Sequence, residues 1–145
     1  MNPRRTILSA TLTALLIAPI AGASAQTPFA DRPHKVIFQI SDADPAKWNL
    51  ALNNARNVQQ DLGKDKVAIE IVAYGPGIGM LKMDSVAGAR VADAMASGMS
   101  VVACENTMTN MKISRDDMLP KISYVGAGVV ELMARQKEGY AYIRP

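Results

Sequence analysis

Cysteine and histidine are almost absent from this chain, which has one of each among its 145 residues. A single cysteine cannot form a disulfide within its own chain, so the sequence excludes a disulfide-stapled scaffold. One cysteine and one histidine are also too few for a zinc site built from these ligands, and we expect neither a metal nor an organic cofactor.

Aromatic residues and excess charge are scarce as well. Aromatics make up 5% of the chain, and the formal net charge is +3. Two of the 16 basic residues, Arg4 and Arg5, lie in a segment that we expect to be removed, which leaves 14 basic residues against 13 acidic ones. With no basic stripe and few aromatics, nucleic-acid binding is unsupported.

The first 25 residues have the order of a secretory signal peptide. A basic start precedes an uncharged apolar run over 6–20, and Ala23-Ser24-Ala25 is a small-x-small cleavage site. The run is shorter than the roughly 20 residues of a membrane-spanning helix. We predict cleavage after Ala25 and a periplasmic location. An uncleaved anchor is the alternative, and the sequence does not decide between Sec and twin-arginine export.

Apolar runs and helical patterns alternate after a flexible lead-in at 26–34, which predicts one domain over 35–145. Asp44 and Pro45 suit the start of the first helix, and Gly63 suits its end. The alternation predicts an α/β fold with parallel pairing, in a small three-layer Rossmann-like or flavodoxin-like domain. The expected strands are 35–40, 67–73, 101–104, 122–127 and 140–143, and the expected helices are 45–62, 84–97 and 129–137, with a partly helical segment at 105–119.

Cys104 is the strongest candidate for a functional residue. Ligands of such sheets bind at the carboxyl ends of the strands, near a topological switch point, and the loops 41–45, 75–79 and 104–109 should gather there. Cys104 ends a strand just before a predicted helix, whose backbone N–H groups favour the thiolate, although Glu105 opposes it. A buried structural cysteine is the alternative. His34 precedes the first strand, at the opposite end of the sheet, which disfavours a Cys/His hydrolase.

Three further groups of residues are candidates for the walls of a pocket around the cysteine. The glycine run after the second strand lets backbone amides approach a bound group, although its spacing is wrong for a dinucleotide site. Two asparagines three residues apart share a face of the first helix. For the glycines the alternative is a tight strand-to-helix connection, and for the asparagines it is a solvated helix face. The third group is Asn106 and Thr107, in the loop that follows Cys104. The candidates are Gly75, Gly77, Gly79, Asn54, Asn57, Asn106 and Thr107.

Methionines form two M-x-x-M pairs, Met80 with Met83 and Met108 with Met111. Thioethers suit Cu(I), which makes a copper site with Cys104 a third hypothesis. Methionine also fills gaps in protein cores, which is the alternative reading of both pairs.

Five segments together resemble the DsrE-like (YchN-type) family, and they span nearly all of the chain after residue 35. The resemblance implies a parallel five-stranded α/β fold, assembly into trimers or hexamers, and sulfur transfer through a cysteine that matches Cys104. The segments are 48–57, 67–81, 103–108, 128–132 and 136–145.

These observations leave three functional hypotheses. The first is a periplasmic sulfur carrier or sulfurtransferase-like relay, in which a Cys104 persulfide exchanges sulfur with a donor or acceptor protein or with a small sulfane-sulfur compound. The second is a non-catalytic oligomeric binding module whose cysteine is only packed, and the third is the Met/Cys copper site. The sequence does not decide whether the protein turns over a substrate, so its status as an enzyme stays open.

Overall fold

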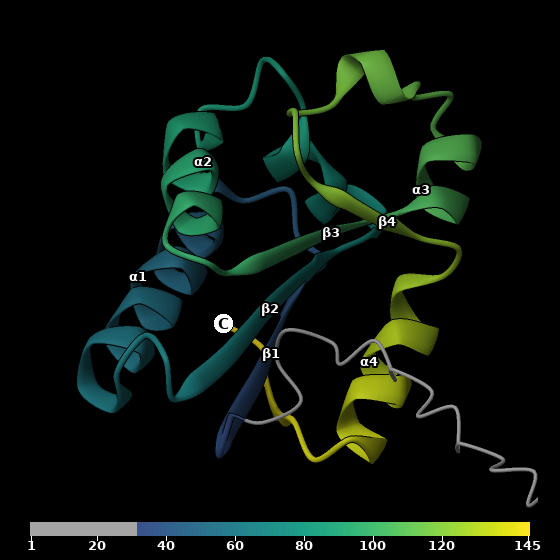
Figure 1. The fold of residues 1–145 in the computed structure, drawn as a ribbon. Helices are drawn as coiled ribbons and strands as arrows, with labels where there is room; N and C mark the ends of the chain where they lie inside the picture. The colour runs from purple at the N-terminus through teal and green to yellow at the C-terminus, as the bar shows by residue number, and fades with distance from the viewer. Residues whose placement is uncertain (1–31) are drawn as a thin grey trace, which may run out of the picture.

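The computed structural model describes residues 32–145, so the predicted signal peptide lies outside the described residues (Figure 1). A five-stranded sheet has the order β4-β3-β2-β1-β5, and every neighbouring pair is parallel. This confirms the predicted α/β fold. The strands are β1 (His34–Ile40), β2 (Val67–Ala73), β3 (Ser100–Cys104), β4 (Ser123–Val125) and β5 (Ala141–Ile143).

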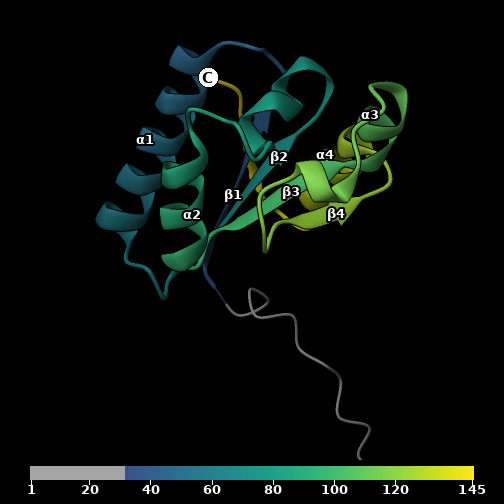
Figure 2. The same ribbon diagram turned by 90° about the horizontal axis from the view of Figure 1, so that it is seen from above.

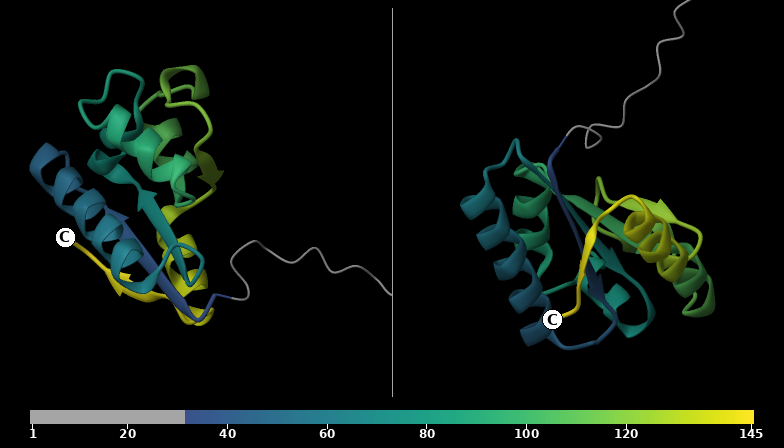
Figure 3. Two further views of the ribbon diagram at one scale, coloured as in Figure 1. Left: turned by 60° about the vertical axis from the view of Figure 1, so that its left-hand side comes forward. Right: turned by 90° about the horizontal axis from the view of Figure 1, so that it is seen from below.

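The helices lie on both faces of the sheet, as Figure 2 shows from above. Two of them, α1 (Pro45–Leu62) and α2 (Gly88–Ala96), cover one face over the larger core. The helix α4 (Gly128–Lys137) covers the other face over a smaller core that includes Leu132 and Tyr140. The chain returns through α4 to place β5 beside β1 (Figure 3).

The first helix begins and ends at the residues that the sequence predicts. The Asp44 carboxylate accepts a hydrogen bond of 2.8 Å from the Ala46 N–H, and Pro45 occupies the first helical position. Gly63 ends the helix with φ of 94°, and its N–H donates to the Gln59 carbonyl at 3.0 Å. A left-handed φ of this kind favours glycine.

Two segments differ from their predicted form. Residues 75–79, expected as a loop, lie in the 3-10 helix η1 (Gly75–Leu81). The helix α2 starts at Gly88, later than predicted, because tight turns occupy 82–88. The segment at 105–119 is helical in part, as predicted, and contains the short α3 (Glu105–Asn110) and a 3-10 turn, η2 (Arg115–Asp117). Hydrogen-bonded turns after residue 82 therefore place the start of α2 later in the chain than the apolar periodicity predicts.

One charged residue lies in the middle of the sheet. Glu70, in β2, is 1% exposed, and its carboxylate pairs with the Arg135 guanidinium of α4 at 3.0 Å. Arg135 also pairs with Glu131 at 2.8 Å and with Glu138 at 3.0 Å. One cation therefore serves three carboxylates beneath α4, on the face with the smaller core.

Within residues 32–145, no helix is long and apolar enough to cross a membrane.

Candidate functional site

Three loops meet at the carboxyl edge of the sheet, as the sequence predicts. The Tyr74 N–H donates to the Ile40 carbonyl at 3.0 Å, which joins the ends of β1 and β2. The Gly75 N–H donates to the Thr107 hydroxyl at 2.9 Å, which joins η1 to α3. A fourth loop, between β4 and α4, joins them where the Gly126 carbonyl accepts from the Asn106 N–H at 3.0 Å.

Cys104 lies within this group of loops, at the last residue of β3. Its thiol is 3.8 Å from the Gly126 carbonyl, to which it donates. The residue is 5% exposed, whereas Asn106 and Gly126 beside it are exposed, so the sulfur lies directly beneath the surface. It is not at the topological switch point: the strand order reverses between β1 and β5, and β2 separates β3 from β1.

The surroundings of the sulfur favour the thiolate. Burial raises the pKa of Cys104, but hydrogen bonds outweigh burial and leave the pKa below its ordinary value. The largest of these comes from the Thr107 side chain, followed by the backbone N–H groups of Gly128, Thr107 and Asn106. The sequence predicts that the negative charge of Glu105 disfavours the thiolate, but in the structure Glu105 is ion-paired with Arg115. Because the thiolate is the nucleophilic form of cysteine, these hydrogen bonds favour reaction at Cys104.

Replacing Thr107 with valine is expected to slow alkylation of Cys104 several-fold at pH 7. The substitution removes the hydroxyl that donates to the sulfur, so the pKa of Cys104 rises and less thiolate is present. The rate of iodoacetamide alkylation, measured by mass spectrometry from pH 6 to 10, gives this pKa directly.

The control variants are Thr107→Ser, which keeps the hydroxyl, and Thr109→Val, which removes an exposed hydroxyl two residues away. Both should alkylate with the pH profile of the unaltered protein. An unchanged profile in Thr107→Val would show that the hydroxyl does not act on the sulfur.

The three glycines of η1 have different structural roles. A Cβ on Gly77 would lie 2.3 Å from the Ile40 carbonyl oxygen, so only glycine allows η1 to approach the end of β1 this closely. Gly79 packs against the Trp48 ring of α1, where a Cβ would lie 3.3 Å from the ring. Gly75 has φ of 52° and is the only one of the three that bonds to the cysteine loop, through Thr107.

Asn54 and Asn57 are not brought to the cysteine. They lie on α1 and line a separate hollow beside Phe38 of β1 and Ile143 of β5. The strand order places β5 three positions from β3, and α4 covers the opposite face. The helical spacing shows that the two asparagines share a face, but not which hollow that face borders.

The sequence does not identify the loop that completes the site. Gly128, at the start of α4, donates its N–H to the sulfur, and a Cβ there would lie 3.1 Å from the Tyr74 side chain. The signal was Gly126-Ala-Gly128 at the end of the predicted fourth strand. Tyr74 is the second missed residue, and burial raises its pKa.

A row of polar side chains extends from Tyr74 along the carboxyl edge. Tyr74 is hydrogen-bonded to the Ser41 side chain, and the Gln39 amide donates to the Ser41 hydroxyl at 3.1 Å. Tyr142 of β5 donates its hydroxyl to the Gln39 carbonyl oxygen. These residues fix the ends of β1, β2 and β5 relative to one another, beside the loop that holds the cysteine.

The two methionine pairs are each divided between core and surface. Met80 and Met108 are buried in the larger core, whereas Met83 and Met111 are 61% and 50% exposed. The two thioethers of each pair therefore lie in different environments. Among residues 32–145, no group of three or more His, Cys, Asp or Glu side chains is placed to hold a metal ion.

Comparisons with known proteins agree with this fold. The family model of the DsrE/DsrF-like family matches residues 34–145. MTH1491 from Methanobacterium thermoautotrophicum, a protein of unknown function, is 37% identical with a TM-score of 0.74, over 77% of this chain and 99% of its own. No curated protein matches the chain.

Two more distant structures share the fold alone. BT1422 from Bacteroides thetaiotaomicron, a conserved protein of unknown function, is 16% identical with a TM-score of 0.64, over 77% of this chain and 94% of its own. The YchN protein from E. coli is 12% identical with a TM-score of 0.63, over 77% and 99%. On the family match over residues 34–145, the chain belongs to the DsrE/DsrF-like family.

Proposed function

We propose that this protein is a sulfur carrier that holds sulfane sulfur as a persulfide on Cys104. The observation that carries the proposal is the convergence of one hydroxyl and three backbone N–H groups on a sulfur just beneath the surface. These donors favour a negative charge on the Cys104 sulfur, and the thiolate is the nucleophile that the loading step requires. Family membership agrees with a sulfur relay but does not by itself assign one.

The loading step needs no oxidant. The Cys104 thiolate attacks the outer sulfur of a persulfide donor, forms a new S–S bond, and breaks the S–S bond of the donor. The donor leaves as a thiolate that takes up the proton the persulfide carried, and the transferred sulfur keeps its oxidation state. Delivery to an acceptor thiolate is the same exchange in reverse, which follows the general course of thiol exchange at sulfur.

The second hypothesis, a binding module with a packed cysteine, is favoured by one observation. Cys104 is 5% exposed, and a free cysteine is commonly a small buried apolar residue. The two hypotheses differ in whether the thiol reacts in the folded protein. A packed cysteine stays inert to sulfur donors, whereas a carrier thiol is loaded.

Incubation with a sulfane-sulfur donor is expected to add one sulfur atom to the protein. Glutathione persulfide is a suitable donor, and intact-mass spectrometry under non-reducing conditions detects the gain. Cys104 is the chain's only cysteine, so Cys104→Ser should show no gain at all. Cyanide or dithiothreitol should remove the added sulfur, because both attack persulfides.

The rate of loading separates specific chemistry from slow background reaction. Loading of Thr107→Val should be several-fold slower than loading of Thr107→Ser at pH 7, because the valine variant holds less thiolate. A gain that persists in Cys104→Ser would remove this residue from the mechanism. The absence of any gain in the folded, unaltered protein would favour the packed-cysteine module.

The periplasmic location and the assembly into trimers or hexamers are part of the same proposal. The order of the first 25 residues supports export, and the family resemblance supports assembly. The exchange partner is a sulfur donor or acceptor protein or a small sulfane-sulfur compound.

A further inference from the structure

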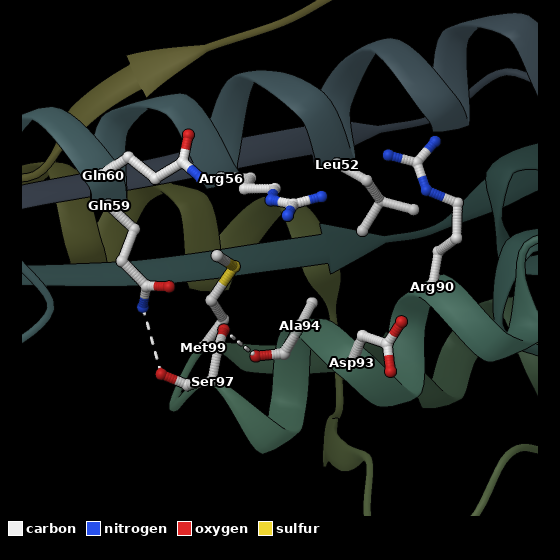
Figure 4. Close-up of a pocket in the computed structure, with 9 residues that line it drawn as sticks. All are labelled: Leu52, Arg56, Gln59, Gln60, Arg90, Asp93, Ala94, Ser97 and Met99. Atoms are coloured by element: carbon white, nitrogen blue, oxygen red, sulfur yellow. Dashed lines mark hydrogen bonds between the residues drawn. The ribbon is translucent and has the colours of Figure 1, made fainter.

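A cleft lies between α1 and α2, on the side of the sheet opposite α4. It holds about 340 Å³ of space, within the usual size of small-molecule sites. Figure 4 shows side chains of α1 reaching across it toward α2, with Met99 rising from below. The cleft lies apart from the Cys104 site, which is formed by the loops at the carboxyl edge.

One wall of the cleft carries an arginine that is held in place. Arg90 of α2 donates to the Asn49 side-chain oxygen at 2.5 Å and to the Asn53 side-chain oxygen at 2.6 Å. Both asparagines belong to α1, so the guanidinium bridges the two helices. Its charge is not neutralised, because both partners are uncharged amides.

A second arginine lines the cleft without a fixed partner. Arg56 of α1 is one helical turn beyond Leu52, and both residues line the cleft (Figure 4). Among the residues that the structure describes, the Arg56 guanidinium has no hydrogen-bond or ion-pair partner. The fork of its guanidinium is therefore available to two oxygens of one anionic group.

The rest of the cleft combines an apolar floor with polar ends. Leu52, Ala94 and Met99 are 4%, 8% and 6% exposed and form the floor. The Gln59 amide closes one end by donating to the Ser97 carbonyl at 3.1 Å. Asp93 is the one carboxylate among the lining residues, so two arginines and one aspartate give the lining a formal charge of +1.

We infer that this cleft binds a small, singly charged, amphipathic anion, namely a medium-chain carboxylate. The carboxylate pairs with Arg56, and its apolar chain lies over Leu52, Ala94 and Met99. A lining charge of +1 matches one negative charge better than the two of a phosphate monoester. The volume and the apolar floor suit a short alkyl chain, because burial of apolar surface favours binding.

Titration of the purified protein with octanoate is expected to show saturable binding at one site per chain. Isothermal calorimetry gives the stoichiometry, and NMR should show shifts at the Met99 methyl group and the Leu52 methyl groups. Arg56→Gln should weaken binding about tenfold or more, since a charge-assisted hydrogen bond contributes at least about that much. Arg56 is exposed on its helix, so this variant should fold normally, which its thermal unfolding checks.

Matched controls make the test specific to charge and place. Lys137→Gln removes an exposed cation of α4, on the other face of the sheet, and should bind octanoate as the unaltered protein does. Octanol has the same chain without the charge and should bind at least about tenfold more weakly. Equal binding of octanol and octanoate, equal binding to Arg56→Gln, or no saturable binding would each overturn the inference. Tighter binding of octyl phosphate than of octanoate would overturn the assignment of a singly charged anion.

Discussion

Replacing Gly77 with alanine is expected to lower the free energy of unfolding by about 3 kcal/mol or more. The added Cβ would lie 2.3 Å from the Ile40 carbonyl oxygen and 2.8 Å from the Ser41 nitrogen. Both are backbone atoms at the end of a central strand, so no side chain can turn away to make room. The chain must instead move η1 away from β1. Urea unfolding followed by circular dichroism measures the loss.

Gly126→Ala is the matched control for this substitution. No atom lies within 4 Å of the position of its added Cβ, and its backbone is outside the left-handed region. Its stability should stay within about 0.5 kcal/mol of that of the unaltered protein. Equal urea midpoints for the two variants would mean that η1 does not require glycine at residue 77.

Glu70→Gln is expected to remove most of a pH dependence of stability between pH 4.5 and 7. Burial raises the pKa of Glu70 from 4.5 to about 7; Arg135 lowers it in part, and Glu131 raises it. The folded protein therefore binds this proton more tightly than the unfolded chain does. The stability from Glu70 is fully present below about pH 4.5 and is lost as the pH rises through about 7.

The free energy of unfolding that is lost through Glu70 is on the order of 2 to 3 kcal/mol between pH 4.5 and 8. Urea unfolding is measured at several pH values for the unaltered protein and for Glu70→Gln. The difference between the two separates the effect of Glu70 from the effects of other titrating groups. Glu138→Gln is the control, because Glu138 also contacts Arg135 but its side chain is 52% exposed. The same pH slope in Glu70→Gln and the unaltered protein would show that Glu70 stays ionised throughout this range.

Most of the fold was predictable because its signals are local. The cap at Asp44, the proline after it and the glycine at residue 63 set the bounds of α1 from neighbouring residues alone. The strands were visible as apolar runs because both faces of the sheet are covered. The start of α2 was predicted wrongly because the turns at 82–88 involve polar residues whose hydrogen bonds the apolar periodicity does not report.

The candidate site was predictable only in part, because it depends on contacts between distant segments. The place of Cys104 at the end of a strand followed from the pattern, as did the meeting of its loop with the glycine run. The contribution of Gly128 depends on how α4 crosses the sheet, 24 positions further along the chain. The contact between Asn53 and Arg90 likewise joins residues of two helices that are 37 positions apart in the chain, so the sequence does not report it.

The two outermost strands, β4 and β5, are each three residues long, whereas β1 and β2 have seven. An edge strand presents unpaired N–H and C=O groups that can recruit a strand from another molecule, and a short edge offers few of them. The sheet therefore has little length over which to add foreign strands at either side. This strand-length pattern limits edge-to-edge aggregation at both sides of the sheet.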